Sequence, residues 1–304
     1  MSTSFLKRAG LVLLALLILW GILALLRRGT SEDIPGFVLP SFDPAALNQI
    51  TITSETDTVH LVRVQGNDWE ANGLPAASPA VNELYNAVFD STTAQRSELA
   101  ARSAQSHTRM GVEGMGRVRM LFMTGPDTLA DLRVGNPTET GRGAFVRLGD
   151  AAEVYRVPTD LARLGSQQVD YWRDKQIVAI ASDQIGGVTV AWPGRRYTLS
   201  RTDGGWNVDD IPADTIAVGT MLRGYAALEA TGFPTTDELD TIDFSSPDGR
   251  IVLHGMSGDT LAALEFDSTA AGIWTRRASG GPVFELAAWY GARLAPDKRV
   301  LTRQ

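Results

Sequence analysis

The chain has 304 residues, 28 Lys and Arg against 35 Asp and Glu, and no cysteine. Without cysteine it has no disulfides, no thiolate metal sites and no cysteine nucleophile. Its formal net charge of −7 argues against nucleic-acid binding, which requires a basic surface, and its length suffices for one or two hydrophobic cores.

An uninterrupted apolar run covers residues 9–26, with Lys7 and Arg8 before it and Arg27 and Arg28 after it. A helix of this length spans about 27 Å, close to the hydrocarbon thickness of a bilayer. The run ends in Leu-Leu-Arg-Arg, which lacks the small-x-small site at which signal peptides are cleaved. We therefore predict an uncleaved signal-anchor helix, with a cleaved signal peptide as the alternative.

The distribution of charge predicts on which side of the membrane the rest of the chain lies. The basic residues before the run favour a cytoplasmic N-terminus, and the basic pair after it weakens this bias. Without these four residues, 24 Lys and Arg stand against 35 Asp and Glu, a net charge of −11. We expect residues 1–28 to form a cytoplasmic stub and a single span of a bacterial inner membrane. The large C-terminal region would then lie in the periplasm or extracytoplasmic space.

The region beyond the apolar run is predicted to contain a spacer and two repeats. Residues 29–46 hold three prolines and little periodicity, which is typical of a spacer. The remainder predicts an α+β fold, in which two tandem repeats of antiparallel β-sheet with helices occupy residues 47–172 and 173–304.

Two similar hairpins indicate the duplication. The strand that begins at Val59 is followed by Gln-Gly-Asn-Asp and Trp69, and the strand that begins at Tyr197 is followed by Thr-Asp-Gly-Gly and Trp206. Each pattern predicts a strand, a turn and a return strand that opens with tryptophan.

A helix is predicted after each hairpin. Ser78 and Pro79 are suited to cap and begin the first helix, and Asp214 is suited to cap the second. In both, the first valine of the apolar face comes twelve residues after the tryptophan. The residues that share these faces are Val81, Leu84, Tyr85, Val88 and Phe89, and Val218, Met221, Leu222, Tyr225 and Leu228.

The segments after the helices correspond as well. Residues 123–132 read MTGPDTLADL and residues 256–264 read MSGDTLAAL. Alternating strands and glycine-rich turns predict about three antiparallel strands and a short helix in each repeat. Because the period is near 130 residues, we interpret the pattern as a duplicated domain rather than a solenoid. Further matched segments are 144–148 with 273–277, 153–157 with 282–286, and 162–164 with 292–294.

The junction between the repeats carries recognisable motifs. Arg173-Asp174-Lys175 comes before a strand predicted at 177–181, and the segments RMGVE from Arg109, LRVG ending at Gly135, and Val154-Tyr155 precede it. Together with the tryptophan hairpins, they resemble the family of domain of unknown function 4340 over roughly residues 47–295. The second repeat departs from this pattern, because Asp267 stands where the first has Gly135.

The resemblance implies a single-pass, membrane-anchored envelope protein, of a family often encoded beside ABC-2-type transporters of the gliding-motility kind. It implies an accessory role and carries no established catalytic residues, so no residue role is transferred.

The residues themselves predict no catalytic, cofactor-binding or metal-binding site. His60, His107 and His254 lack the spacing of metal ligands, and each is predicted to be a surface or half-buried imidazole. Residues 254–259 (HGMSGD) lack the Gly-x-Ser-x-Gly spacing of a nucleophile elbow and are predicted to form a hairpin turn. The glycines of GVEGMG at 111–116 are predicted to form turns. Acidic residues cluster at Asp209, Asp210 and Asp214 and at Asp237, Glu238, Asp240 and Asp243, where helix capping and solvated loops are the expected roles.

The leading hypothesis is a non-enzymatic, membrane-anchored extracytoplasmic accessory or subunit of an ABC-2-type transport system, with the bilayer and the ABC permease and ATPase as partners. The alternative is a module that binds an envelope polymer or glycan through exposed aromatic residues. An uncharacterised hydrolase is a third possibility, and it requires several residues to converge in one pocket. The oligomeric state stays open. The residues that would have to converge are Asp209, Asp210, Asp214, His254 and Ser257.

Overall fold

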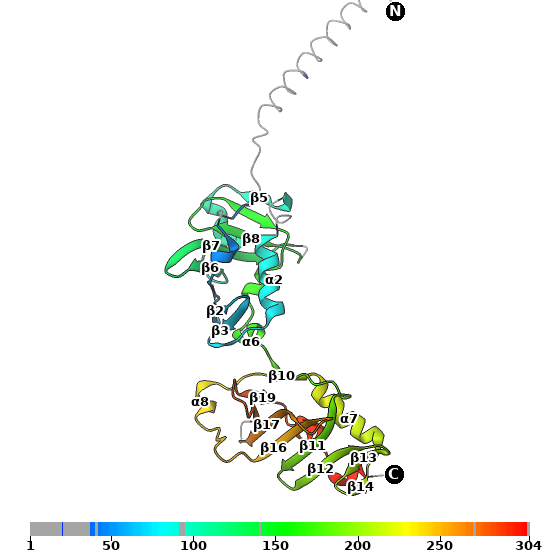
Figure 1. Cartoon of the computed structure of the whole chain (residues 1–304). Helices are drawn as coiled ribbons and strands as arrows, with labels where there is room; N and C mark the ends of the chain where they lie inside the picture. The colour runs from blue at the N-terminus through cyan, green and yellow to red at the C-terminus, as the bar shows by residue number, and fades with distance from the viewer. Residues whose placement is uncertain are drawn as a thin grey trace, which may run out of the picture. The chain divides into compact units, whose positions relative to one another are not determined.

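The computed structural model describes Trp20 and residues 37–39, 42–90, 95–139, 141–269 and 272–302 (Figure 1). Apart from Trp20, the apolar run predicted to span the membrane lies outside these residues, and the spacer is described only at 37–39 and 42–46. Among the described residues, none of the helices combines the length and the hydropathy that a membrane span requires.

The described chain is a mixed α/β structure, made mostly of antiparallel sheets with a few helices. The predicted mixture of antiparallel sheet and helix is therefore confirmed. The chain forms two compact units: the first contains the described residues of Met1–Thr58 and Asn82–Ser166, and the second those of Val59–Val81 and Gln167–Gln304. This division is one of spatial compactness, and the repeat boundary at 172/173 stays a prediction.

The sheet of the first unit is antiparallel throughout. Its strands follow the order β1-β6-β7-β8-β9-β5, so that four consecutive strands form a meander between β1 and β5. In β6, Val118, Met120 and Phe122 are buried while Arg119 is exposed, which is the alternation of a strand with one face on the core. The bounds are β1 (Gln49–Thr53), β5 (Glu98–Ala101), β6 (Val118–Thr124), β7 (Asp127–Pro137), β8 (Ala144–Leu148) and β9 (Val154–Val157).

Short helices complete the first unit. They are η1 (Pro44–Ala46), η2 (Ala104–Ser106), α4 (His107–Met110) and α5 (Leu161–Gly165). Gly111 ends α4 in the left-handed conformation, with φ of 71°, which glycine adopts without steric cost. Helix α2 (Ser78–Phe89) begins at Ser78 and includes residues of both units.

The second unit contains a small meander and a large sheet. The small meander is formed by β2 (Thr58–Gln65), β3 (Asp68–Ala71) and β4 (Leu74–Pro75). The large sheet is antiparallel, in the order β14-β13-β12-β11-β16-β17-β18-β19. Its bounds are β11 (Ile185–Trp192), β12 (Arg195–Thr202), β13 (Gly205–Val208), β14 (Ile211–Pro212), β16 (Gly249–Gly255), β17 (Thr260–Ser268), β18 (Ile273–Arg277) and β19 (Phe284–Leu286).

The second unit also has a two-stranded sheet and five helices of its own among the described residues. Strands β10 (Gln176–Val178) and β15 (Leu228–Glu229) pair with each other. The helices are α6 (Val169–Trp172), α7 (Thr215–Ala226), α8 (Thr236–Leu239), α9 (Tyr290–Leu294) and α10 (Lys298–Leu301). The strand predicted at 177–181 is thus shorter and begins one residue earlier.

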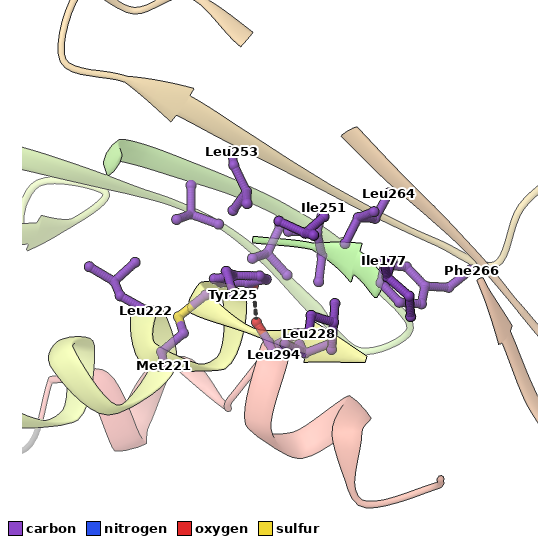
Figure 2. Packing of buried hydrophobic residues seen from close by; sticks show 14 of the residues in the cluster. Ile177, Met221, Leu222, Tyr225, Leu228, Ile251, Leu253, Leu264, Phe266 and Leu294 are labelled. Atoms are coloured by element: carbon purple, nitrogen blue, oxygen red, sulfur yellow. Dashed lines mark hydrogen bonds between the residues drawn. The ribbon is translucent and has the colours of Figure 1, made fainter. Parts of the chain in front are cut away.

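Helix α7 covers the inner face of the large sheet (Figure 2). Asp214 caps the helix as predicted, because its carboxylate accepts from the backbone N–H of Ile216 at 2.7 Å and of Ala217 at 3.1 Å. The helix ends at Ala226, so Leu228, predicted on the same helix face, lies in β15 instead and is fully buried there. Met221, Leu222 and Tyr225 pack in one cluster with Ile251, Leu253, Leu264 and Phe266 of β16 and β17.

Both predicted hairpins are present, as β2–β3 and β12–β13. The matched segments also form hairpin β6–β7 and hairpin β16–β17, and short helices α5 and α9 follow the last strands. The predicted number of about three strands was too small, because each meander has four strands, β6 to β9 and β16 to β19.

Candidate functional site

The junction motif Arg173-Asp174-Lys175 borders a cavity of about 580 Å³ in the second unit. The walls come from residues 76–79 at the start of α2, from the end of α6 and the segment after it, and from Glu229 of β15. This volume is within the range of about 300–1,000 Å³ that ligand pockets occupy. Because it also carries the junction motif, we take it as the candidate site.

Backbone pairing fixes the wall that carries the motif. The N–H of Ala77 donates to the carbonyl of Trp172 at 2.7 Å, and the N–H of Asp174 donates to the carbonyl of Pro75 at 2.8 Å. Ala76 and Arg173 face each other in this antiparallel bridge. The carbonyl of Lys175 in turn accepts from Ala230 at 2.8 Å. The motif is therefore held between the chain after β4 and the chain after β15.

Arg173 positions this wall rather than reaching into solvent. Its side chain is only 16 % exposed, and its Nη1 donates to the Asp170 carboxylate at 3.1 Å. The guanidinium carbon also lies 5.1 Å from the centre of the Phe233 ring. The partly buried guanidinium is therefore compensated in charge by the Asp170 carboxylate and packs against an aromatic face.

Both signs of charge remain at the cavity wall. Among the described residues, the side chains of Lys175 and Glu229 have no ion-pair or hydrogen-bond partner. The Asp174 carboxylate accepts from the N–H of Gln176 at 2.9 Å. A solvated surface with both signs of charge suits contact with a polar protein segment. Catalysis would instead require several reactive side chains that point to one place.

The residues considered for hydrolysis have separate structural roles. Asp209 pairs with Lys298 at 2.5 Å, and this hydrogen bond, with that from the N–H of Thr198, lowers the pKa of the Asp209 carboxyl. His254 Nε2 lies 3.0 Å from the hydroxyl of Thr189 on the neighbouring strand. Asp214 caps α7 as described above, and Asp210 is exposed.

Ser257 lies in the hairpin turn between β16 and β17, as predicted, and its hydroxyl donates to the Asp259 carboxylate. Within the described residues, Ser257 makes no hydrogen bond or ion pair with His254, Asp209 or Asp214. The structure thus does not bring together the residues that a hydrolase would need, as far as the described chain shows.

The second acidic cluster serves local structure. Glu238 forms a capping box with Thr235 at the start of α8, and the hydrogen bonds from Thr235 lower the pKa of its carboxyl. Hydrogen bonds from the side chain and the backbone N–H of Ser245 lower the pKa of the Asp243 carboxyl as well. In the part of the chain that the structure describes, no three His, Asp or Glu side chains gather as a metal site would require.

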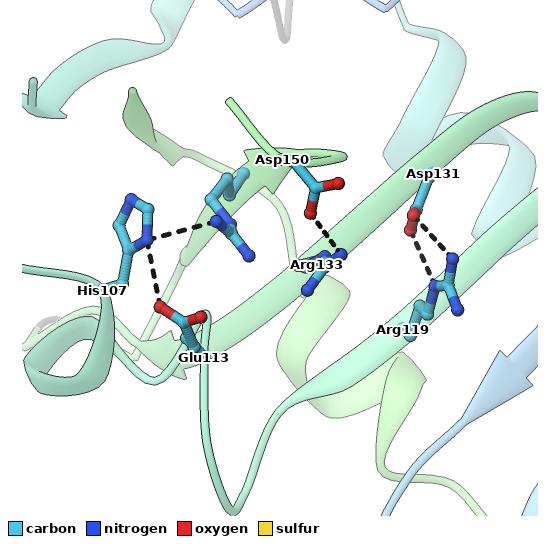
Figure 3. Close-up of polar contacts among 7 residues, drawn as sticks. His107, Glu113, Arg119, Asp131, Arg133 and Asp150 are labelled. Atoms are coloured by element: carbon cyan, nitrogen blue, oxygen red, sulfur yellow. Dashed lines mark hydrogen bonds and ion pairs between the residues drawn. The ribbon is translucent and has the colours of Figure 1, made fainter. Parts of the chain in front are cut away.

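His107 is the main departure from the sequence interpretation (Figure 3). It was predicted at the surface or half-buried, but it is 2 % exposed and the prediction is wrong. Its Nε2 lies 2.9 Å from the carbonyl of Ala152, and its Nδ1 lies 3.2 Å from Arg147 Nη1 and 3.3 Å from the Glu113 carboxylate. The carbonyl requires a proton on Nε2, so Nδ1 accepts from Arg147 in the neutral ring. Glu113 can accept from Nδ1 only when the ring carries both protons.

No local signal in the sequence marks this burial. His107 follows the polar stretch Ser103–Ser106, and its partner Arg147 lies 40 residues later in β8. Only the packing of α4 against the sheet brings the two together.

The tryptophans differ in exposure. Trp69 is 7 % exposed, Trp172 is fully buried and Trp206 is half-buried. Trp289 is 54 % exposed and stacks on Tyr290 with ring centres 3.8 Å apart. A platform for sugar rings would need exposed aromatic faces, and Trp69 does not offer one.

Comparison with known proteins adds one finding. The model of a family described as domain of unknown function (DUF4340) matches residues 69–247, which is more than half of the chain. The matched region includes the junction motif and all of the residues that line the cavity. No curated protein and no solved structure matches the chain.

Proposed function

Because this chain belongs to the family of domain of unknown function 4340, we propose that it is a non-enzymatic accessory or subunit of an ABC-2-type, gliding-motility-like transport system. In this proposal it is a single-pass protein of a bacterial inner membrane. The apolar run at 9–26 anchors it, and the large C-terminal region lies outside the cytoplasm. The observation that carries the proposal is this run of membrane-spanning length in front of an acidic region that matches the family.

We further propose that the folded region arose by duplication. The series β2-β3-β4, α2, β6 to β9 and α5 corresponds, element by element, to β12-β13-β14, α7, β16 to β19 and α9. In addition, β1 pairs with β6 as β11 pairs with β16. Both 12-residue helices occupy the same place in the series. This correspondence supports two tandem α+β repeats.

We assign the cavity beside the junction motif Arg173-Asp174-Lys175 to contact with a transport partner. The charged side chains of Lys175 and Glu229 lie at its wall, and Arg173 keeps that wall in place. A polar loop of the permease on the outer side of the membrane would find both a cationic and an anionic group there. The span would concentrate this surface near the permease.

Two observations weigh against the alternatives. Trp69 is buried, which removes one of the two equivalent aromatic residues that a glycan-binding module could use. Asp209, Asp214, His254 and Ser257 each have a separate partner, which argues against hydrolysis.

The test is purification of the tagged full-length chain from native membranes in mild detergent, with companions identified by mass spectrometry. We expect stoichiometric recovery of an ABC permease and its ATPase. Recovery of the chain alone, or with envelope polymer and no transporter, would reject the accessory role and favour the binding module.

A matched pair of variants tests the cavity in the same experiment. Lys175→Glu reverses a charge at the cavity wall, and Arg299→Glu reverses one on the exposed face of α10. We expect only Lys175→Glu to lower recovery of the permease. Equal recovery with both variants would show that the partner docks elsewhere.

A further inference from the structure

Three arginines line a second, smaller cavity in the first unit. Arg96, Arg142 and Arg156 border a space of about 210 Å³, together with Thr138 and Gly143. Arg156 lies in β9, Arg96 just before the edge strand β5, and Arg142 in the turn between β7 and β8. We name this the arginine cavity. It is below the usual size of pockets for drug-sized ligands, so it suits a single charged group.

The arginine cavity is basic in a chain whose net charge is −7. Arg156 Nη2 donates to the Glu98 carboxylate at 2.5 Å, and both side chains are about half exposed or more. In the described chain, the guanidinium groups of Arg96 and Arg142 have no carboxylate or other hydrogen-bond partner. None of the lining residues is acidic. Two uncompensated guanidinium groups therefore remain for an anion.

The backbone holds the arginine cavity in shape. The N–H of Thr138 donates to the carbonyl of Gly143 at 2.8 Å, and the N–H of Gly141 donates to the carbonyl of Thr138 at 2.8 Å. A Cβ on Gly143 would lie 2.5 Å from the carbonyl oxygen of Val157, so the turn approaches β9 as closely as only glycine allows. This tight turn holds Arg142 on the wall that Arg156 also lines.

The described segment that follows the apolar run in the sequence packs on the β5–β9 edge of the sheet, which also carries Arg156. The N–H of Phe37 donates to the Ser97 hydroxyl at 2.5 Å, and the Phe37 ring lies 5.8 Å from that of Tyr155. Ser97 directly follows Arg96, and Tyr155 directly precedes Arg156 on β9, so the Tyr155 ring lies on the opposite face of the sheet from Arg156. Only residues 27–36 separate the apolar run from Phe37, so this edge of the sheet lies within about 40 Å of the end of the run.

We propose that the arginine cavity binds the phosphate headgroup of an anionic phospholipid in the membrane that anchors the chain. Guanidinium groups bind phosphate oxygens in a bidentate manner, and two or three of them match one phosphate. Because only a short connection joins this edge of the sheet to the apolar run, membrane lipid is the nearest source of phosphate. The inference rests on the proposed membrane anchoring, but it requires no transporter.

The experiment uses the full-length chain purified in neutral detergent, titrated with phosphatidylglycerol or phosphatidylcholine and analysed by native mass spectrometry. We expect retention of phosphatidylglycerol in preference to phosphatidylcholine. The double variant Arg96→Gln/Arg142→Gln should weaken phosphatidylglycerol binding about tenfold or more, because two charge-assisted hydrogen bonds are lost. Both residues are exposed, so the change does not disturb the core.

The control is Arg196→Gln/Arg250→Gln, which removes the same charge from the second unit. These two arginines flank Ala191 on β12 and β16, are exposed, and have no ion-pair partner among the described residues. We expect this control to retain the lipid. An equal loss in both double variants would show non-specific attraction and overturn the proposal.

Two further measurements distinguish lipid from soluble phosphate as the ligand, and distinguish failure of the lipid site from failure of the membrane anchoring. Inorganic phosphate that displaces phosphatidylglycerol at similar concentration would identify a site for soluble phosphate and overturn the lipid assignment. Release of the full-length chain from membranes by alkaline carbonate would reject the anchoring, and with it both proposals. Retention in the membrane without preference for phosphatidylglycerol would reject the lipid site alone.

Discussion

The guanidinium carbon of Arg63 lies 5.0 Å from the centre of the Trp69 ring, directly opposite it across the β2–β3 pair. Arg201 has the same relationship to Trp206 across β12–β13, at 5.8 Å. A cation over an aromatic face stabilises a cross-strand pair beyond the contact area alone. The β2–β3 pair has a bulge between Arg63 and Gln65 that β12–β13 lacks, but the same directly opposed pair in both hairpins supports the proposed duplication.

The Arg201–Trp206 pair predicts a small, specific loss of stability. Arg201→Met keeps an unbranched apolar side chain but removes the cation, and it should lower the free energy of unfolding by about 0.5–1 kcal/mol. Urea denaturation followed by tryptophan fluorescence measures the change. Arg196→Met on the same strand is the control, and it should change the free energy of unfolding by less than about 0.5 kcal/mol. Equal losses in the two variants would show that the contact with the Trp206 ring contributes nothing.

Tyr225 is predicted to stabilise the second unit through its hydroxyl group. This hydroxyl donates to the carbonyl of Leu294 at 2.5 Å, and the Tyr225 side chain is fully buried (Figure 2). Tyr225→Phe keeps the ring and leaves the carbonyl without this donor, which should cost about 1–3 kcal/mol. Urea denaturation checks the value, and a loss below about 0.5 kcal/mol would contradict the assigned role.

Burial also predicts alkaline instability. Burial raises the pKa of Tyr225 well above its ordinary value of 10.0, and it raises that of Tyr197 as well. In the unfolded chain both phenols ionise near pH 10, so the unfolded state loses protons that the folded state keeps. Stability should therefore be unaffected by these groups below about pH 10 and should fall as the pH rises further.

Denaturation at several pH values between about 9 and 12 measures this slope. The double variant Tyr197→Phe/Tyr225→Phe should show a shallower decline than the unmodified chain above about pH 10. Identical slopes would mean that other groups cause the alkaline loss. Tyr290, which is half-buried at the surface, supplies the control variant Tyr290→Phe.

Gly135 is predicted to tolerate no side chain. A Cβ there would lie 2.1 Å from the carbonyl oxygen of Met110, at the place where β7 passes the end of α4. Gly135→Ala should lower the free energy of unfolding by about 2 kcal/mol or more, or prevent folding, because backbone must move. Gly204→Ala is the control, with open space around its Cβ. Circular dichroism and thermal unfolding compare the two, and similar melting temperatures would refute the clash.

His107 is predicted to be required for the stability of the first unit. His107→Leu removes the partner of the Ala152 carbonyl and of Arg147 Nη1, which are 2.9 and 3.2 Å from the ring. We expect a loss of about 2–4 kcal/mol, because Arg147 is itself buried. His60→Leu, at an exposed position of β2, should change stability by less than about 0.5 kcal/mol. Equal effects in thermal unfolding would show that the buried cluster has no special role.

The difference between Gly135 and Asp267, which the sequence comparison places at matching positions, has a structural explanation. Gly135 lies against the end of α4, and no side chain fits there. Asp267 is in a different environment. Its carboxylate accepts a hydrogen bond from the N–H of Asp243 at 2.9 Å and thereby holds the loop before β16. The two positions therefore carry different residues because different segments pack against them.

Local secondary structure could be predicted from neighbouring residues. The spacing of Val218, Met221, Leu222 and Tyr225 indicated the helix, and Asp214 indicated where it begins. The hairpins of Trp69 and Trp206 followed from turn residues between alternating strands, because turn geometry and strand alternation act over a few neighbouring residues. The 18-residue apolar run similarly depends only on composition and length.

Contacts between side chains that are distant in the sequence could not be predicted and depend on how the elements pack. His107 and Arg147 are 40 residues apart, Tyr225 and Leu294 are 69 apart, and neither pair has a local pattern. The arginine cavity forms because a turn, a strand and an edge segment are brought together by the register of β7, β8, β9 and β5. Periodicity reports which face of an element is buried, but strand register and helix packing decide what that face touches.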